Sequence, residues 1–430
     1  MTSIVATNQT ILVVGGGIAG MTAALEAAET GKQVVLVEKN PWLGGRTAQL
    51  YRYFPKMCHP TCGLEINLRR LKANPRIQVL TMAEVTAISG TAGDYSVNVT
   101  LSPRYVNSKC TACGECAKAV STEIADAFNY NLGKVKAAYL PHDMAYPQRY
   151  VLDPSIIGTA DAEAAKAACK VDAIELDQQV ETVTLNAGAI VWATGWQPYA
   201  AEKITPYRYG EFKNVITNVE FERLADPHGP TKGKILRPSD GREAKNVAFI
   251  QCAGSRDENH LRHCSRFCCM ASLKHTHYVQ EAFGDEGKST IYYIDIRAID
   301  RFEDFYQKVK ANPNVTFVKS KVARISEDKN GDPRLWGVNT EGYKRYSEPH
   351  DLVVLAVGME PAVKGMAIPA ALSEGIASDS SGFLAMNGNT GVFGAGCATN
   401  ALDVNRAVQS ATAAALRAIQ VVNQVARAEN

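Results

Sequence analysis

Four cysteines lie close together in the segment CAGSRDENHLRHCSRFCC: Cys252, Cys264, Cys268 and Cys269. Thiolates are soft ligands that select zinc or iron–sulfur clusters. Structural zinc usually takes its cysteines in spaced pairs, which the adjacent Cys268 and Cys269 match poorly. We therefore predict a [4Fe–4S] cluster on these four sulfurs. Zinc, a vicinal disulfide and inert buried thiols are the alternatives.

A second group of cysteines follows the spacing of a bacterial ferredoxin. Segment NSKCTACGECAKAV has the C-x2-C-x2-C start of that motif, but Val120 stands where its fourth cysteine is due. Further on, GTADAEAAKAACKVDAIELD matches a second such motif that keeps only Cys169. The cysteine positions it lacks are Thr159, Ala162 and Ala165.

The losses follow a pattern. In two-cluster ferredoxins the fourth cysteine of each motif ligates the other cluster. One ligand set is therefore complete here, and the other is wholly absent. We predict one surviving [4Fe–4S] cluster, on Cys110, Cys113, Cys116 and Cys169.

A βαβ unit near the N-terminus is the first element that positions a cofactor. In ILVVGGGIAGMTAALEAAETGKQVVLVEKN an apolar strand at 11–14 leads through a G-x-G-x-x-G turn into a helix, and a second strand at 34–37 ends at Glu38. Glycines at the turn let a pyrophosphate approach the helix N-terminus. Glu38 is placed to accept hydrogen bonds from a ribose diol. A glycine-rich loop without a ligand is the alternative.

Three later segments favour FAD, because they resemble motifs of two-dinucleotide flavoprotein reductases. They are GGRT (44–47), IVWATG (190–195) and GVFGAGCATN (391–400). The expected cofactor-binding residues are Gly15, Gly17, Ile18, Ala19, Gly20, Glu38, Lys39, Gly44, Gly45, Arg46, Thr47, Val85, Ala193, Thr194, Gly195, Gly396 and Cys397.

In that architecture a second βαβ domain binds NAD(P)H. NVAFIQ is its first strand here, MASLKHTHYVQEAF its helix and STIYYIDIRA its second strand. Only Gly254 stands where a glycine-rich turn is needed, among the four cysteines of the first group. We therefore expect no nicotinamide site, and we expect the thiols to occupy the place of the nucleotide.

Cys58 and Cys62 remain, in FPKMCHPTCGLEINL. A C-x3-C pair soon after a flavin-binding strand is compatible with a redox disulfide facing the flavin, and an inert or structural role is the alternative. Cys62 is also the rival of Cys169 as a cluster ligand. His59 has no evident base partner, and we predict no acid–base catalytic residue.

These elements predict an α/β, two-dinucleotide-binding-domain flavoprotein with a degenerate ferredoxin-like insert. We expect an FAD domain at 1–100, 179–245 and 356–430, the insert with one cluster at 101–178, and a nicotinamide-type domain converted to cluster binding at 246–355.

Composition narrows the class of protein. The chain has 430 residues and a net charge of +2, which argues against nucleic acid as a partner. Its eleven clustered cysteines fit metal ligation in a reducing cytoplasm better than a disulfide framework. No uncharged apolar stretch predicts a transmembrane helix, and we expect no signal peptide.

The flavin turn, FPKMCHPTCGLEI, CTACGEC and QCAGSRD…HCSRFCCMASLKH together resemble the large flavoprotein component, named HdrA, of heterodisulfide reductase. In that family the last motif ligates a [4Fe–4S] cluster. STEIADAF, GKVKAAYLPH and RYVLDPS make the chain still more similar to the corresponding flavoproteins of quinone-interacting membrane-bound oxidoreductase complexes.

This resemblance implies an electron-transfer flavoprotein acting between the membrane quinone pool and adenylylsulfate reductase in dissimilatory sulfur metabolism. Its partners would be a second, related flavoprotein of the HdrA type and a haem- and iron–sulfur-containing membrane protein, which would hold it on the cytoplasmic side of the membrane. Alternatives are a component of a soluble heterodisulfide reductase-type complex in sulfur oxidation or methanogenesis, a free-standing disulfide reductase, and a non-catalytic cluster-binding sensor or scaffold.

Overall fold

The computed structural model describes residues 9–365, 376–386 and 390–428. Backbone contacts divide the chain into two units. Unit 1 consists of Met1–Ala48, Thr61–Trp196 and Pro361–Asn430, and unit 2 of Gln49–Pro60 and Gln197–Glu360. No helix in the described ranges is both long and apolar enough to cross a membrane.

Unit 1 is built on a five-stranded parallel sheet in the order β24-β11-β1-β2-β3. The strands are β1 (Ile11–Val14), β2 (Val34–Glu38), β3 (Ile77–Thr81), β11 (Ala189–Trp192) and β24 (Val392–Gly394). β1, β2 and β11 are continuous apolar runs buried along their whole length, as expected of parallel strands covered on both faces.

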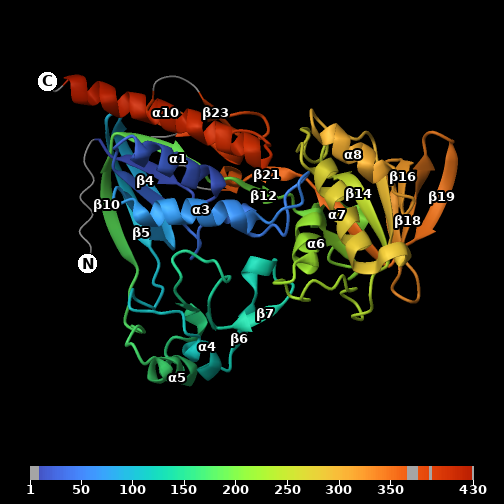
Figure 1. The fold of residues 1–430 in the computed structure, drawn as a ribbon, viewed down its shortest axis with the longest axis horizontal. Helices are drawn as coiled ribbons and strands as arrows, with labels where there is room; N and C mark the ends of the chain where they lie inside the picture. Colours follow the sequence, from blue (N-terminus) through green and yellow to red (C-terminus); the bar gives the residue numbers. More distant parts are fainter. Residues whose placement is uncertain (1–8, 366–375, 387–389, 429–430) are drawn as a thin grey trace. The chain divides into compact units, whose positions relative to one another are not determined.

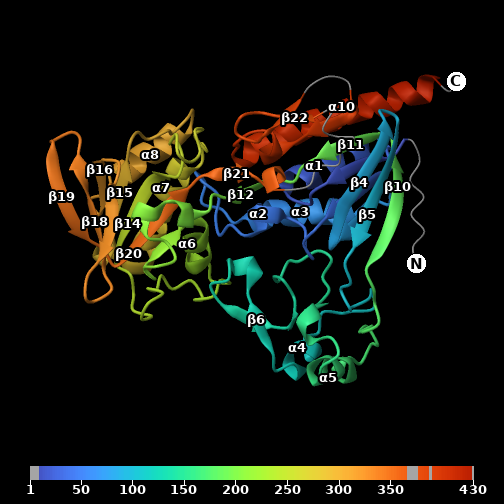
Figure 2. The same ribbon diagram turned by 180° about the vertical axis from the view of Figure 1, so that it is seen from behind.

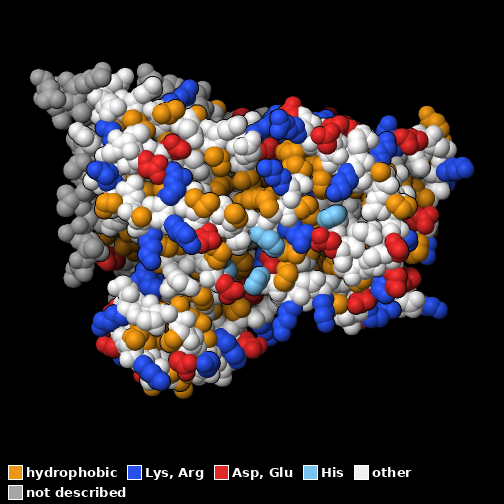
Figure 3. Space-filling model, in the orientation of Figure 1, with side chains coloured by type: hydrophobic (Ala, Val, Ile, Leu, Met, Phe, Trp, Pro, Cys, Tyr) orange, Lys and Arg blue, Asp and Glu red, His pale blue; other side chains and the backbone are white. Residues whose placement is uncertain are grey.

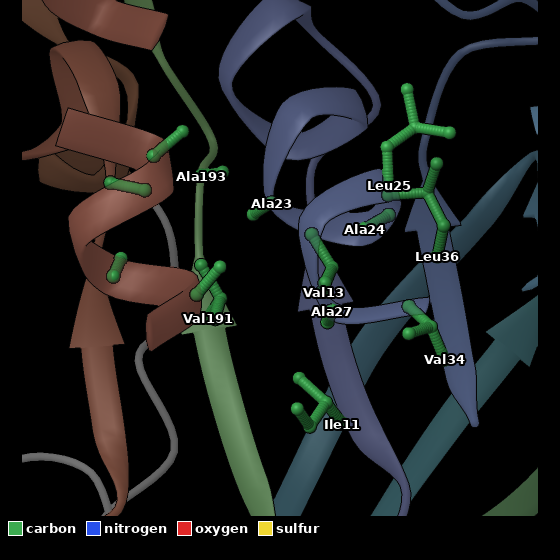
Figure 4. Packing of buried hydrophobic residues seen from close by; sticks show 14 of the residues in the cluster. Ile11, Val13, Ala23, Ala24, Leu25, Ala27, Val34, Leu36, Val191 and Ala193 are labelled. Carbon is green, nitrogen blue, oxygen red and sulfur yellow. The ribbon is translucent and has the colours of Figure 1, made fainter. Parts of the chain in front are cut away.

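Two different layers cover this sheet. Ile11, Val13 and Leu36 pack under helices on one face, as Figure 4 shows for α1. The three helices are α1 (Ile18–Glu29), α3 (Pro60–Ala73) and α10 (Val404–Ala428). The other face packs on a three-stranded antiparallel sheet, whose strands stand side by side in Figures 1 and 2. These are β4 (Ala83–Thr91), β5 (Asp94–Leu101) and β10 (Glu181–Ala187).

The insert between β5 and β10 has short elements around a small apolar core of its own. Two antiparallel hairpins, β6 with β7 and β8 with β9, accompany two helices that pack on each other. The elements are α4 (Glu115–Ala119), β6 (Glu123–Ala125), β7 (Lys134–Lys136), β8 (Ala138–Tyr139), β9 (Val151–Leu152) and α5 (Ala160–Ala168).

Unit 2 contains a second five-stranded parallel sheet, in the order β13-β20-β14-β15-β16. Its elements are β13 (Val215–Thr217), α6 (Asn218–Ala225), β14 (Asn246–Ala253), α7 (Cys268–Phe283), β15 (Lys288–Tyr293), α8 (Phe302–Lys310), β16 (Val315–Lys319) and β20 (Leu352–Val357). A three-stranded antiparallel sheet of β17 (Arg324–Glu327), β18 (Pro333–Asn339) and β19 (Lys344–Pro349) completes it.

The boundary of unit 2 lies earlier than the start at residue 246 that we expected for the second domain. β13 pairs with β20 in the second sheet, and α6 follows β13 directly, so residues from Gln197 onward group with this sheet. The short segment Gln49–Pro60 also groups with unit 2.

On the face drawn in Figure 3, acidic and basic side chains are interspersed, in keeping with a net charge of +2.

Candidate cofactor sites

At the turn from β1 into α1, Gly15 and Gly20 have no room for a side chain. A Cβ on Gly20 would lie 1.7 Å from the carbonyl oxygen of Gly15, and a Cβ on Gly15, whose φ is +105°, would lie 2.4 Å from the carbonyl oxygen of Ala193. Gly17 precedes α1 without a side-chain cap. The first N–H groups of the helix are therefore available to a phosphate, which is the arrangement that dinucleotide-binding turns use.

Three segments distant in sequence converge on this turn. The N–H of Gly44 donates to the carbonyl oxygen of Gly16 at 2.8 Å. The N–H of Ala193 donates to the carbonyl oxygen of Val14 at 2.7 Å. A Cβ on Gly396 would lie 2.6 Å from the Cβ of Ala19. The structure thus brings together the motifs that we expected to bind FAD.

Glu38 ends β2 with its carboxylate buried against the turn. Its Oε2 accepts from the N–H of Gly16 at 2.6 Å, and its Oε1 accepts from the backbone and side-chain nitrogens of Asn40 at 2.8 and 2.7 Å. Burial raises the pKa of Glu38 although these hydrogen bonds oppose it. A carboxylate can accept about four hydrogen bonds. The three donors named above therefore leave the carboxylate of Glu38 able to accept one more, from a ribose hydroxyl.

The other expected FAD residues differ in environment. Lys39 is exposed, and Val85 packs on the apolar cluster under β1 and β2. The hydroxyl of Thr194 is buried and makes no hydrogen bond among the described residues. Cys397 donates its thiol to the carbonyl oxygen of Leu402 at 3.4 Å, and burial raises its pKa to about 11.

The four cysteines retained in the insert line one small cavity together. Cys116 lies in α4, and Cys169 directly follows α5. Burial raises the pKa of Cys116 to about 11, and the neighbouring thiolates of the set add to this. The N–H groups of Ala112 and Ala173 point at the sulfurs of Cys110 and Cys169, at 3.4 and 3.3 Å. Such N–H donors are what cluster thiolates accept from a protein.

The positions that lack cysteines are filled by apolar packing. Val120, Ala162 and Ala165 are buried, and Val120 and Ala165 belong to the insert's own core. Thr159 donates its hydroxyl to the carbonyl oxygen of Ile156 at 2.6 Å. Cys62 is exposed on α3 and does not line the cysteine cavity. The geometry therefore favours Cys169 over Cys62 as the fourth sulfur.

The second quartet stands at the carboxyl edge of the sheet in unit 2. Cys252 is next to last in β14, where the pairing with β20 shifts register, and its φ is +56°. A bulge of this kind redirects side chains, and a non-glycine residue in the left-handed region is a sign of functional constraint. Cys268 and Cys269 begin α7, and Cys264 lies in the connecting loop.

Hydrogen bonds hold that loop against the strand after β20. Ser265 accepts from the N–H of Met359 at 2.8 Å, and the ring of His263 contacts the carbonyl oxygen of Met359 at 2.9 Å. The sulfur of Cys268 lies 3.7 Å from the carbonyl oxygen of Val357 at the end of β20. Ligands of open α/β sheets bind at this edge, and the four cysteines lie there.

The sulfurs of this quartet influence one another electrostatically. Burial raises the pKa of Cys269 to about 11 and that of Cys268 well above its usual range, and the thiolates of Cys252 and Cys264 add to both. In the described ranges no three Cys, His, Asp or Glu side chains form a group that could hold a single metal ion.

Cys58 and Cys62 are both exposed. His59 is exposed, and its ring lies against the ring of Tyr51, with centroids 5.0 Å apart. A redox role for the two cysteines stays a prediction.

Sequence patterns missed two groups of residues. One is the contact of Arg46 with Tyr130, and the other is a buried ionic network around Glu222 and Lys274. In the sequence, Tyr130 is an aromatic residue in a loop, and Glu222 and Lys274 are charged residues within helices. Charged residues in helices are usually exposed to solvent, so neither pattern predicts these contacts.

Comparison with known proteins agrees with this architecture. The family model described as FAD dependent oxidoreductase matches residues 10–211. Thioredoxin reductase from T. acidophilum has the same fold, with a TM-score of 0.52 at 14% identity, covering 96% of this chain and 98% of its own. The bacillithiol disulfide reductase of Bacillus cereus also scores 0.52, at 12% identity, covering 97% and 99%.

Curated relatives match over nearly the whole chain. The HdrA component of the ferredoxin:CoB-CoM heterodisulfide reductase of Methanosarcina mazei is 35% identical over 96% of this chain and 53% of its own length. An iron-sulfur HdrA component of the CoB-CoM heterodisulfide reductase of Methanopyrus kandleri is 36% identical, covering 95% and 63%. The chain thus spans between about half and two thirds of the length of these relatives. Over nearly its whole length the chain is thus similar to HdrA components of heterodisulfide reductases, and it contains an FAD-dependent oxidoreductase domain.

Proposed function

We propose that this chain is an FAD and iron–sulfur electron-transfer component of a heterodisulfide reductase-like complex. One observation carries the proposal: the second parallel sheet holds four cysteines at the edge where a reductase of this fold would bind a nucleotide. With thiol ligands in place of a nicotinamide site, the second domain would transfer single electrons through a cluster and would not accept a hydride from NAD(P)H.

Separate sets of residues would hold the FAD and each of the two clusters. The turn at Gly15, Gly17 and Gly20, together with Glu38 and the converging motif segments, would hold FAD. The two quartets would each hold one [4Fe–4S] cluster: Cys110, Cys113, Cys116 and Cys169 in the insert, and Cys252, Cys264, Cys268 and Cys269 in unit 2. When bound, FAD exchanges electrons in pairs and a cluster exchanges them singly.

The chain's own residues position and tune these groups. Without a Cβ on Gly20 the turn stays close enough for backbone N–H groups to meet a pyrophosphate. The N–H of Arg266 donates to the sulfur of Cys264 at 3.4 Å, as Ala112 and Ala173 do in the insert. Donors to sulfur stabilise negative charge on the cluster and raise its potential.

We further propose that the complex connects the membrane quinone pool with adenylylsulfate reductase in dissimilatory sulfur metabolism, on the cytoplasmic side of the membrane. STEIADAF, GKVKAAYLPH and RYVLDPS support this role by their resemblance to quinone-interacting complexes. The curated relatives are named as components of CoB-CoM heterodisulfide reductases, which supports a heterodisulfide reductase-type complex as the second candidate.

Isolation of the tagged chain from its native source separates the two candidates. We expect a second, related flavoprotein and a haem-containing membrane protein to purify with it. Co-purification with the other components of a soluble heterodisulfide reductase would favour the second candidate. A monomer that reduces quinone alone would refute both.

Mixing the anaerobic protein with excess NADH or NADPH tests the relay directly. We expect the flavin absorbance to persist, because the segment between β14 and α7 lacks a glycine-rich turn. Rapid, stoichiometric bleaching would restore an ordinary nicotinamide-dependent reductase.

A further inference from the structure

The guanidinium of Arg46 is held between two aromatic rings. Its Nε donates to the carbonyl oxygen of Trp196 at 3.2 Å, and its Nη1 donates to the hydroxyl of Tyr130 at 3.0 Å. The guanidinium also lies over both rings, 5.3 Å from the centroid of Tyr130 and 5.5 Å from that of Trp196. Stacking and directed hydrogen bonds together restrict a guanidinium to one orientation.

Two of these three residues belong to the flavin motifs. Arg46 lies in α2 (Gly45–Ala48), where a Cβ on Gly45 would come within 2.9 Å of the Cα of Gly17. Trp196 directly follows the motif that ends at Gly195. Tyr130 comes from the insert. A side chain of the insert therefore helps to fix a cation beside the dinucleotide turn.

The backbone that carries Tyr130 is strained. A short 3-10 helix, Ala127–Asn129, is capped by Asp126, whose carboxylate accepts from the N–H of Asn129 at 3.2 Å. Tyr130 and Asn131 then both adopt the left-handed conformation, with φ of +54° and +63°. Asparagine tolerates this region, whereas tyrosine rarely occupies it. Strain of this kind persists where the surrounding structure imposes it, often at functional sites.

Further contacts fasten the same part of the insert to the flavin segment. The ring of Phe128 packs edge-on against Trp42, with centroids 5.6 Å apart. The N–H of Leu43 donates to the carbonyl oxygen of Tyr146 at 3.1 Å. The insert thus packs against residues 42–46, and it also contains the cavity lined by its four cysteines.

We propose that Tyr130 is a positioning residue that holds Arg46 at the flavin and so couples the insert to the flavin's redox potential. The inference rests on the FAD site proposed above. A positive charge fixed near the flavin favours its reduced, more negative form. If Arg46 loses its hydrogen bond to Tyr130, that charge becomes less well placed and the flavin potential falls.

Tyr130→Phe tests this, because it removes the hydroxyl and keeps the ring. In the holoprotein we expect unchanged FAD and iron content. We also expect the equilibrium between oxidised and reduced flavin to shift tenfold towards oxidised, which is about 30 mV for a two-electron couple. The readouts are a spectroelectrochemical titration and the visible circular dichroism of the flavin. Tyr139→Phe is the control, since the hydroxyl of Tyr139 makes no hydrogen bond among the described residues.

Each outcome decides the proposal. Loss of FAD from Tyr130→Phe with the iron content retained would overturn it, because the hydroxyl would then act on flavin binding and not on the flavin potential. An unchanged flavin potential and dichroism would overturn it, even if the variant melts at a lower temperature. Absence of FAD from the wild type would instead refute the proposed function.

A double variant shows whether Tyr130 acts through Arg46. Arg46→Lys keeps the charge but loses the fork that donates to both partners. We expect it to lower the flavin potential by itself, and we expect Tyr130→Phe to add no further shift in that background. Additive shifts would mean that Tyr130 acts independently of Arg46, which would refute the mechanism.

Discussion

The two parallel sheets use the same edge in opposite ways. In unit 1, Gly15–Gly17 connect β1 to α1, and the glycines leave space for a phosphate. In unit 2, residues 254–267 connect β14 to α7 and are tied back to the strand that follows β20. The glycine connection in unit 1 places no side chains at the edge of the sheet. The longer connection in unit 2 places cysteine side chains there. In both sheets the connection stands at the edge where ligands of open α/β sheets bind, and the two connections differ in the residues they place there.

The helix layers differ as well. α1 meets its sheet with alanine and leucine side chains. In unit 2 the carboxylate of Glu222 in α6 is buried between the ammonium of Lys274, at 2.7 Å, and the ring of His275, at 2.6 Å, both from α7. It also accepts from the N–H of Tyr51 at 2.8 Å, which ties the segment Gln49–Pro60 to α6.

Gly20→Ala should have the largest effect, on the first connection. The new Cβ would lie 1.7 Å from the carbonyl oxygen of Gly15, so the turn must open and the purified protein should lack FAD while keeping its iron. Flavin absorbance and iron content measure this. Gly63→Ala is the control, because a Cβ there meets no atom within 4 Å. An unchanged FAD content would contradict the assignment of this turn.

Cys268→Ala tests the second connection. The variant should fall from about eight irons per chain to about four and keep its FAD. Cys58→Ala should keep both clusters, because Cys58 is exposed and outside the quartet. If Cys268→Ala still bound eight irons, the thiols of unit 2 would not be cluster ligands and the contrast between the two sheets would fail.

Cys169→Ala tests the insert in the same way. We expect it to lose the insert's cluster and to retain FAD and the cluster of unit 2, because Cys169 lines the cavity with the other three cysteines. Cys62→Ala should retain both clusters. Electron paramagnetic resonance of the reduced proteins distinguishes the two clusters, and the reverse result would make Cys62 the ligand.

Lys274→Met should have the smallest effect, on the free energy of unfolding. Removing one partner of a buried ion pair costs about 3–5 kcal/mol, which urea unfolding at neutral pH measures. Lys245→Met removes only exposed pairs, with Glu243 and Glu286, and should destabilise the protein far less than Lys274→Met. Equal costs would show that the buried network does not stabilise unit 2.

The cost of Lys274→Met should depend on pH. Burial alone would raise the pKa of Glu222, but Lys274 and His275 outweigh burial and hold it below its ordinary value of 4.5. A lowered carboxyl pKa contributes stability that is present above that ordinary value and is lost as the pH falls. The difference between wild type and Lys274→Met should therefore shrink in acid below about pH 4.5. A difference that grows in acid would contradict this sign.

Much of the site was readable from local patterns. A glycine turn and a cysteine motif act through residues close in sequence, so their spacing alone indicated the flavin turn and the two quartets. The two-dinucleotide fold followed from the same motifs, and the structural relatives confirm it. The missing cysteines at Val120 and Ala165 were also visible in the sequence, but their burial in the insert's core was not.

Contacts between residues distant in sequence decided the rest. β13 and α6 belong to the second sheet because β13 pairs with β20, more than a hundred residues later. In the sequence, Glu222 has the pattern of an exposed charge in a helix. It is buried because α7 packs over α6 and pairs Lys274 with it. Arg46 and Tyr130 meet because the insert folds back onto the flavin segment. Spacing reports what neighbouring residues can do together, whereas burial and pairing depend on which elements the fold brings into contact.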